Sequence, residues 1–319
     1  MPLIDFSSLP DGSDAWLFPG QGAQQIGMSL DFAAEDPDVR ALFSEADQIL
    51  KSSLTSLIES GPEDELVRTA NTQPAVFVAS LAALKAATSH SQALELSRPR
   101  FVAGHSLGEY SAVVASGSLS FADGLKLVQE RARLMQEASE ETPGTLAALL
   151  GASLDQAKAL CEATGCEVCN INAPGQIVIG GPVEAVAAAV DAAREHGIKR
   201  AMPLKVGGAF HTSLMSPAAR GLQSYLDHLE IDEPQVPVVA NGSAETLTTP
   251  EALRAELTFQ LDHPVLWQDG VQKMAADGVT RFIEFGPGAV LTGMVKRIAP
   301  EAQTLNVSSL ADLASPVAS

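Results

Sequence analysis

FVAGHSLGEYSAVVA, residues 101–115, decides the fold of this chain. Its first four residues form an apolar run that predicts a buried strand, and the small residues of 107–115 predict a helix. Between them stands Gly104-His105-Ser106-Leu107-Gly108, a G-x-S-x-G pattern. A sharp strand–turn–helix elbow needs glycines two residues either side of the serine, because side chains there would collide with neighbouring elements. The stretch therefore predicts an exposed nucleophile, Ser106; a glycine-rich turn with a capping serine is the alternative.

Strands alternate with helices on both sides of this elbow, which predicts a mostly parallel sheet covered on both faces. Upstream, the apolar run 15–18 predicts a strand, and helical periodicity covers 38–59 and 73–88. Downstream we expect helices at 121–138, 213–229, 250–261, 264–276 and 288–298, and strands at 236–240 and 281–285. The last ten residues or so look loosely attached.

The middle of the chain has a different order of elements. Its patterns predict strand 145–150, helix 154–164, strands 167–172 and 176–180, helix 182–196 and strand 200–205. This βαββαβ order is the plan of a ferredoxin-like unit. We therefore expect a large α/β domain made of 1–139 and 207–319, with an inserted ferredoxin-like subdomain at 140–206.

The composition excludes several classes of function. The 319-residue chain has 20 lysines and arginines against 39 aspartates and glutamates, a net charge of −19, so we expect no nucleic-acid binding. Its 46% hydrophobic residues provide for a substantial core. We find no apolar stretch of membrane-spanning length, and residues 1–14 lack the basic and apolar regions of a signal peptide. We expect a cytoplasmic monomer that binds no membrane.

Cys161, Cys166 and Cys169 are too few and too clustered for a disulfide framework, which fits a reducing compartment. Their spacing matches the first three ligands of a plant-type [2Fe–2S] site. A fourth cysteine is missing, and no histidine lies nearer downstream than His196. Small core residues are the better interpretation, and we expect neither a metal nor a cofactor.

A nucleophilic serine needs a general base, and six histidines compete for that role. His211 follows 206–210, a strand end that runs into a glycine-containing loop, and such loops gather the catalytic groups of parallel sheets. His263 precedes Pro264 at a helix start, where it is also a candidate cap. By position alone His211 is the first candidate and His263 the second.

Two further features suit acyl transfer. The loop Phe18-Pro19-Gly20-Gln21-Gly22 follows a strand and offers a backbone N–H toward a developing oxyanion, beside that of Leu107. An ordinary β–α turn is the alternative. Arg131 and Arg133 lie on the helix after the elbow, and either is a candidate clamp for a substrate carboxylate. Surface arginines that balance acidic neighbours are the alternative.

Six short blocks of sequence spread over roughly residues 14–300. They are Phe18-Pro-Gly-Gln-Gly-Ala-Gln24, Gly104-His-Ser-Leu-Gly-Glu-Tyr-Ser111, Gln129-Glu-Arg131, Asn172-Ala-Pro-Gly-Gln-Ile-Val178, Gly208-Ala-Phe-His211 and Phe285-Gly-Pro-Gly288. In this order the blocks resemble those of the malonyl-CoA:acyl carrier protein transacylases and the related acyltransferase domains of polyketide and fatty acid synthases. Several blocks in order are far more specific than any one of them. The resemblance implies a hydrolase-like α/β domain with an inserted ferredoxin-like subdomain.

The resemblance also implies a role for each matching residue. Ser106 would be the acylated nucleophile and His211 its general base, in a dyad without a carboxylate. A backbone carbonyl at Gln260 would orient the histidine. The backbone N–H groups of Gln21 and Leu107 would form the oxyanion hole.

Two more residues would select the acyl group. Arg131 would hold the free carboxylate of malonyl, and Phe210 would shape the pocket, since members that use methyl-branched units usually carry a smaller residue there. The implied activity is ping-pong transfer of malonyl from malonyl-CoA to the phosphopantetheine thiol of acyl carrier protein through an O-malonyl serine, which supplies fatty acid synthesis.

Other functions stay open at this point. A discrete acyltransferase that serves a polyketide synthase in trans differs only in its carrier protein. A serine thioesterase or hydrolase would use water as acceptor, although Arg131 argues against it, and intact Ser106 and His211 argue against a non-catalytic binding module. Because carrier proteins are acidic, docking on this chain needs a local basic patch, for which the candidates are Lys199, Arg200, Lys205, Lys296 and Arg297.

Overall fold

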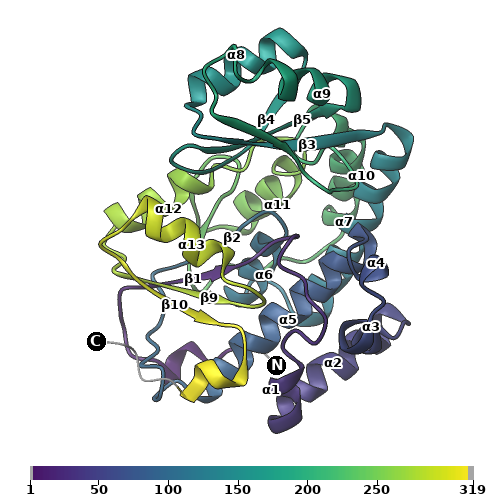
Figure 1. Ribbon diagram of the computed structural model, residues 1–319. Coiled ribbons are helices and arrows are strands. Elements are labelled where there is room, and N and C mark those ends of the chain that lie inside the picture. Colours follow the sequence, from purple (N-terminus) through teal and green to yellow (C-terminus); the bar gives the residue numbers. More distant parts are fainter. Residues whose placement is uncertain (1–2, 315–319) are drawn as a thin grey trace.

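A six-stranded sheet lies at the centre of the molecule in this computed structural model, which describes residues 3–314 (Figure 1). The strand order is β10-β9-β1-β2-β7-β8. All neighbours pair in parallel except β7 and β8, which pair antiparallel. The strands are β1 (Asp14–Phe18), β2 (Phe101–Gly104), β7 (Val238–Val239), β8 (Thr246–Leu247), β9 (Arg281–Phe285) and β10 (Gln303–Val307).

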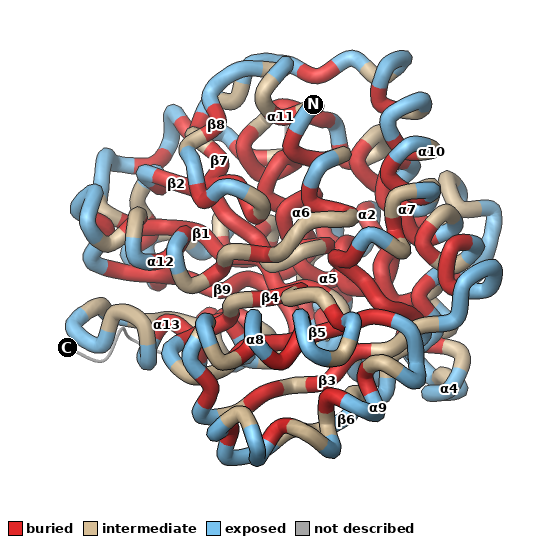
Figure 2. The backbone as a smooth tube through the Cα atoms, turned by 90° about the horizontal axis from the view of Figure 1, so that it is seen from above, coloured by how far each residue is buried: buried red, intermediate tan, exposed pale blue. Residues whose placement is uncertain are grey.

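Helices cover both faces of this sheet because successive strand residues point to opposite sides. Trp16 and Phe18 of β1 pack into the cluster formed with α5 (Thr69–Ser89), whereas Ala15 and Leu17 pack into the cluster formed with α12 (Trp267–Ala276) and α13 (Val290–Ile298). Buried residues concentrate along the strands and the inner helices, as Figure 2 shows. The parallel, doubly covered sheet confirms the expected α/β class.

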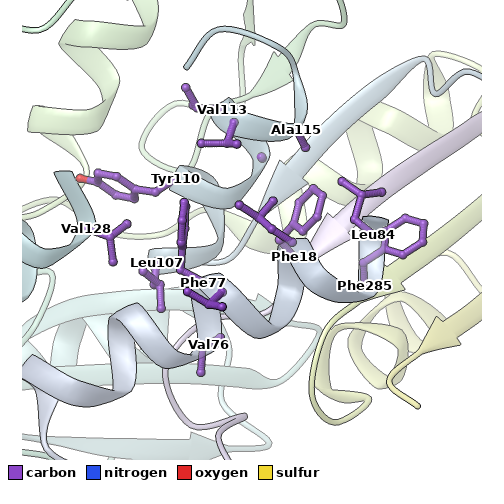
Figure 3. Packing of buried hydrophobic residues seen from close by; sticks show 14 of the residues in the cluster. Phe18, Val76, Phe77, Leu84, Leu107, Tyr110, Val113, Ala115, Val128 and Phe285 are labelled. Carbon is purple, nitrogen blue, oxygen red and sulfur yellow. The ribbon is translucent and has the colours of Figure 1, made fainter. Parts of the chain in front are cut away.

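The larger cluster is built on α5, α6 (Leu107–Ala115) and α7 (Phe121–Glu141). Figure 3 shows Leu107 and Tyr110 of α6 near Val76 and Phe77 of α5. Helix α5 is apolar on nearly all sides and is buried on nearly all sides, as such a helix requires. Packing against α5 and α7 therefore holds α6 in place, and α6 in turn holds the elbow that precedes it.

A second, four-stranded antiparallel sheet is built from the middle of the chain, in the order β4-β5-β3-β6. Its elements are β3 (Gly144–Leu150), α8 (Leu154–Thr164), β4 (Glu167–Ala173), β5 (Gln176–Pro182), α9 (Val183–Ala192) and β6 (Arg200–Pro203). Both helices pack with the sheet into a separate core that contains Cys161 and Cys166. The expected βαββαβ order is present; the domain division at 140–206 stays a prediction.

Strand β4 also forms backbone hydrogen bonds with a segment outside the small sheet. Ile171 donates its backbone N–H to Val265 (2.9 Å), and Val265 donates to Cys169 (2.8 Å). The segment that contains Val265 follows α11 (Pro250–Phe259), and it therefore joins the small sheet to the ends of the parallel strands. The junction lies beside the serine elbow, since the ring centres of Trp267 and His105 are 5.7 Å apart.

Two expectations need correction. The single helix expected at 38–59 is two helices, α2 (Pro37–Leu50) and α3 (Leu54–Ser60), because Lys51 is left-handed with φ 51° and ends α2. Of the last ten residues, expected to be loosely attached, 310–314 form a 3-10 helix with Leu313 buried, whereas residues 315–319 lie outside the described residues.

The remaining helices are η1 (Phe6–Ser8), α1 (Leu30–Glu35), α4 (Glu63–Leu66), η2 (Ser213–Met215), α10 (Ser216–Leu226) and η3 (Leu310–Ala314). Of the helices in the described residues, none is long and apolar enough to cross a membrane.

Candidate active site

The expected elbow is present between β2 and α6. Ser106 has φ 54° and ψ −106°, a strained conformation for a residue with a side chain, and α6 begins at the next residue. A Cβ atom on Gly104 would overlap the main chain of Gly108, and one on Gly108 would overlap the carbonyl of Phe18. Both glycines are therefore required by close packing of β1, β2 and α6.

Asn241, which follows β7, holds the elbow in this conformation. Its Oδ1 accepts the backbone N–H of Ser106 (2.7 Å), and its Nδ2 donates to the carbonyl of Gly104 (2.7 Å). Sequence reasoning missed Asn241. The available signal was a polar residue directly after a parallel strand, a position where such sheets carry functional groups.

Ser106 and His211 meet across the site. Ser106 Oγ lies 2.7 Å from His211 Nε2, and His211 Nδ1 lies 2.6 Å from the carbonyl oxygen of Gln260. A carbonyl oxygen only accepts, so Nδ1 carries the proton and Nε2 is free to accept the serine proton. The expected arrangement of serine, histidine and backbone carbonyl is present.

His263, the second candidate by position, does not reach the serine. Its Nδ1 lies 2.8 Å from Asp262 Oδ1 and 2.9 Å from the carbonyl of Phe259. Its ring stacks on Phe259 with the ring centres 3.5 Å apart. These local contacts hold the His263 side chain near the end of α11.

Burial keeps His211 neutral. The histidine is 4% exposed, and desolvation together with the positive charge of Arg131 lowers its pKa to about 3. A histidine that is neutral at physiological pH can accept a proton there, as a general base must.

Arg131 of α7 lies beside the dyad and is 1% exposed. Its Nη2 donates to Ser106 Oγ and to Gln260 Oε1, both at 3.1 Å, and its Nη1 donates to Gln73 Oε1 at 2.7 Å. The guanidinium also lies over the ring of Tyr110, 4.9 Å from its centre. Arg133, the other expected candidate, instead pairs with acidic neighbours on the exposed side of α7.

In the part of the chain that the structure describes, no carboxylate lies within 4.0 Å of Arg131, and its Nε has no hydrogen-bond partner. A buried carboxylate, Glu109, lies one side chain away: it accepts from Gln260 Nε2 (2.9 Å) and attracts the guanidinium without touching it. A buried cation with no carboxylate in direct contact is stabilised further by an anionic ligand. This arginine therefore marks a site for an anionic group next to the serine.

Two backbone N–H groups are available near Ser106. Within residues 3–314, the N–H groups of Gln21 and Leu107 have no acceptor in the protein. Leu107 is the first residue of α6, where the helix dipole favours negative charge, and Gln21 lies in the turn that follows β1. Gly20 brings that turn against the elbow, since a Cβ atom there would overlap the carbonyl oxygen of His105.

A cavity of about 230 Å³ opens onto these groups. Its apolar wall includes Phe210, which is 7% exposed, together with Met135 and Leu146. The small sheet contributes Asn170 and Asn172, and Asn172 Oδ1 lies 2.8 Å from His105 Nε2. The cavity is thus formed between the two sheets, and it is lined by the nucleophile, its base, Gln21 with its free N–H, and a cation that no carboxylate contacts.

Comparisons with known proteins agree with this site. Residues 15–315 match the family described as "Acyl transferase domain". The malonyl CoA-acyl carrier protein transacylase of Bacillus subtilis strain 168 is 42% identical over 299 residues, which is 92% of this chain and 93% of the relative.

Two solved structures are similar over nearly the whole chain. An acyl carrier protein S-malonyltransferase from Vibrio cholerae superposes with a TM-score of 0.88 at 40% identity, covering 95% of this chain and 99% of its own. A malonyl-transacylase in complex with a holo type II polyketide acyl carrier protein gives 0.91 at 39% identity, covering 96% and 99%. The similarity therefore extends over both sheets.

Proposed function

The chain belongs to the acyl transferase family, and within it to the malonyl-CoA:acyl carrier protein transacylases, and we propose that it works through an O-malonyl ester of Ser106. It is an acyl-carrier-protein S-malonyltransferase: it moves the malonyl group from the thiol of coenzyme A to that of acyl carrier protein. The observation that carries the proposed mechanism is the contact of Ser106 Oγ with both His211 Nε2 (2.7 Å) and Arg131 Nη2 (3.1 Å).

In the first half-reaction, Ser106 Oγ attacks the thioester carbonyl while His211 Nε2 takes the hydroxyl proton. The carbonyl oxygen becomes anionic, and the N–H groups of Gln21 and Leu107 stabilise the charge as it develops. The C–S bond then breaks, and His211 returns its proton to the departing thiolate of coenzyme A. Malonyl remains on Ser106.

The second half-reaction reverses these steps with another thiol. His211 takes the proton of the phosphopantetheine thiol, the thiolate attacks the ester carbonyl, and the C–O bond to Ser106 breaks with return of the proton. Because coenzyme A leaves before the carrier protein reacts, the mechanism is ping-pong. The carbonyl of Gln260 keeps the His211 ring in the required tautomer throughout.

Arg131 and Phe210 account for the choice of acyl group. The carboxylate of malonyl supplies the negative charge that the buried guanidinium lacks, whereas acetyl would leave it unpaired. Phe210 narrows the cavity and disfavours a methyl branch. Both roles are supported by the position of these residues in the cavity wall.

We propose that the acyl carrier protein that receives malonyl from this chain serves fatty acid synthesis. A polyketide acyl carrier protein is the alternative, since one relative is solved in complex with such a partner. A docking patch at Lys199, Arg200, Lys205 and Lys296 remains a proposal. Arg297 is less suited to docking because it already donates to Gln176 Oε1 (2.6 Å) and the carbonyl of Pro174 (2.5 Å). Reversing the charge of Lys199 and Arg200 should raise the KM for acyl carrier protein. An unchanged KM would show that acyl carrier protein does not dock at these residues.

A cytoplasmic location and a monomeric state are further proposals. Buried free thiols at Cys161, Cys166 and Cys169 support a reducing compartment. Sedimentation velocity tests the oligomeric state, and a dimer at micromolar concentration would contradict it.

The transferase mechanism is tested by incubating the protein with malonyl-CoA and holo acyl carrier protein and measuring malonyl-carrier protein by mass spectrometry. We expect product from the native chain and none from Ser106→Ala or His211→Ala. Steady release of coenzyme A without malonyl-carrier protein would indicate a hydrolase instead.

A further inference from the structure

Neutral amide oxygens are the hydrogen-bond acceptors that hold the guanidinium of Arg131 from two sides. Gln73 of α5 approaches Nη1 with its Oε1 at 2.7 Å, and Gln260 approaches Nη2 with its Oε1 at 3.1 Å. A carboxylate in either place would bind the arginine more strongly, since ion pairs with hydrogen bonds are stronger than neutral ones. The chain places amides in direct contact with the guanidinium, and the buried carboxylate of Glu109 stands behind Gln260, so the amides orient Arg131 without forming an ion pair with it.

The Gln73 side chain has a hydrogen-bond partner for both its oxygen and its nitrogen. It is fully buried, and its Nε2 donates to Met135 Sδ at 3.4 Å. Both contacts favour this orientation of the amide, because the reverse orientation would place its NH2 group against the guanidinium. The oxygen of Gln73 is thereby held toward Arg131.

We propose that Gln73 is a specificity-determining positioning residue: its neutral oxygen aims Arg131 at the cavity and leaves the positive charge of the arginine for the carboxylate of the substrate. The proposal rests on the proposed function, in which Arg131 binds the malonyl carboxylate. It explains why the shortest hydrogen bond of Arg131 is to an amide on α5, a helix that contributes no other group to the proposed reaction.

The test is Gln73→Glu, which has nearly the same shape but adds a negative charge 2.7 Å from Nη1. The new carboxylate pairs with Arg131 and competes with the substrate. We expect kcat/KM for malonyl-CoA to fall about 30-fold or more, the lower end for losing a buried charge pair, while kcat/KM for acetyl-CoA is retained or rises. The selectivity ratio is the readout, because a merely structural defect lowers both values together.

Two controls separate charge from shape. Gln73→Met removes the acceptor and keeps the charge of Arg131 unpaired, so its malonyl-to-acetyl ratio should fall less than that of Gln73→Glu. Gln48→Glu on the exposed side of α2 adds the same charge far from the cavity and should leave the ratio unchanged.

The proposal is overturned if Gln73→Glu keeps the native ratio, if it lowers both substrates equally, or if Gln73→Met lowers the ratio as much. A native chain that forms no malonyl ester on Ser106, or shows no preference for malonyl-CoA over acetyl-CoA, would overturn the proposed function itself. The two failures are distinguished by measuring the native chain first.

Discussion

Replacing Arg131 with methionine removes the cation beside the nucleophile while keeping most of the side-chain volume over Tyr110. The native arginine is 1% exposed and has no carboxylate partner among the described residues. A malonyl carboxylate would therefore form a desolvated charge pair with it. Removing one partner of such a pair costs about 2–5 kcal/mol.

That range corresponds to a loss of about 30-fold to a few thousand-fold in kcat/KM for malonyl-CoA, at about 1.36 kcal/mol per tenfold. Acetyl-CoA has no carboxylate to lose. The bond from Nη2 to Ser106 Oγ is lost for both substrates and cancels in their ratio. The malonyl-to-acetyl ratio should consequently fall by at least about 30-fold.

The assay measures initial rates of coenzyme A release with each thioester in the presence of holo acyl carrier protein. Arg133→Met is the matched control, because Arg133 lies on the same helix but pairs with Glu130 and Glu137 at the surface. The control should keep the native ratio. If Arg131→Met also stays within threefold of the native ratio, the carboxylate does not bind at Arg131 and the reasoning is wrong.

Three further predictions follow from the same contacts. Because the pKa of His211 is lowered to about 3, the base is deprotonated and active above that pH, so kcat/KM should stay level from about pH 8 down to pH 5; an acidic limb with a midpoint between 6 and 7 contradicts the burial argument. Asn241→Ala leaves the N–H of Ser106 and the carbonyl of Gly104 unpaired, which should lower the free energy of unfolding by about 2–6 kcal/mol in urea titrations. A loss under about 0.5 kcal/mol, typical of a surface substitution, would show that the elbow does not depend on Asn241. Phe210→Ser should lower the malonyl-to-methylmalonyl ratio of kcat/KM about tenfold or more by widening the cavity, and an unchanged ratio would exclude Phe210 from the acyl pocket.

The elbow was predictable because its requirements are local. Glycines at 104 and 108 and the small residues of 107–115 fix the turn and the helix, and α6 has those bounds. The βαββαβ order was predictable for the same reason, since each of its elements has a regular pattern and a turn on either side. Strand β10 was not, because Gln303–Val307 is short and half polar and is stabilised by long-range contacts, its pairing with β9 and the burial of Val307 in the core.

The partners within the site were harder to predict. Position alone ranked His211 above His263, and the two are distinguished by the contact of His211 with Ser106, 105 residues away, which only the folded chain provides. Asn241 and Gln73 were missed because they act 135 and 58 residues away from the groups they hold. No local pattern marks a glutamine within a buried, alanine-rich helix as the neighbour of an arginine.

The central claim is that Ser106 carries the malonyl group between the two thiols. Intact-protein mass spectrometry after brief incubation with malonyl-CoA tests it most directly. We predict a malonyl-sized adduct that is absent from Ser106→Ala and is discharged by holo acyl carrier protein. An adduct that persists in Ser106→Ala, or one that the carrier protein does not remove, would contradict the account.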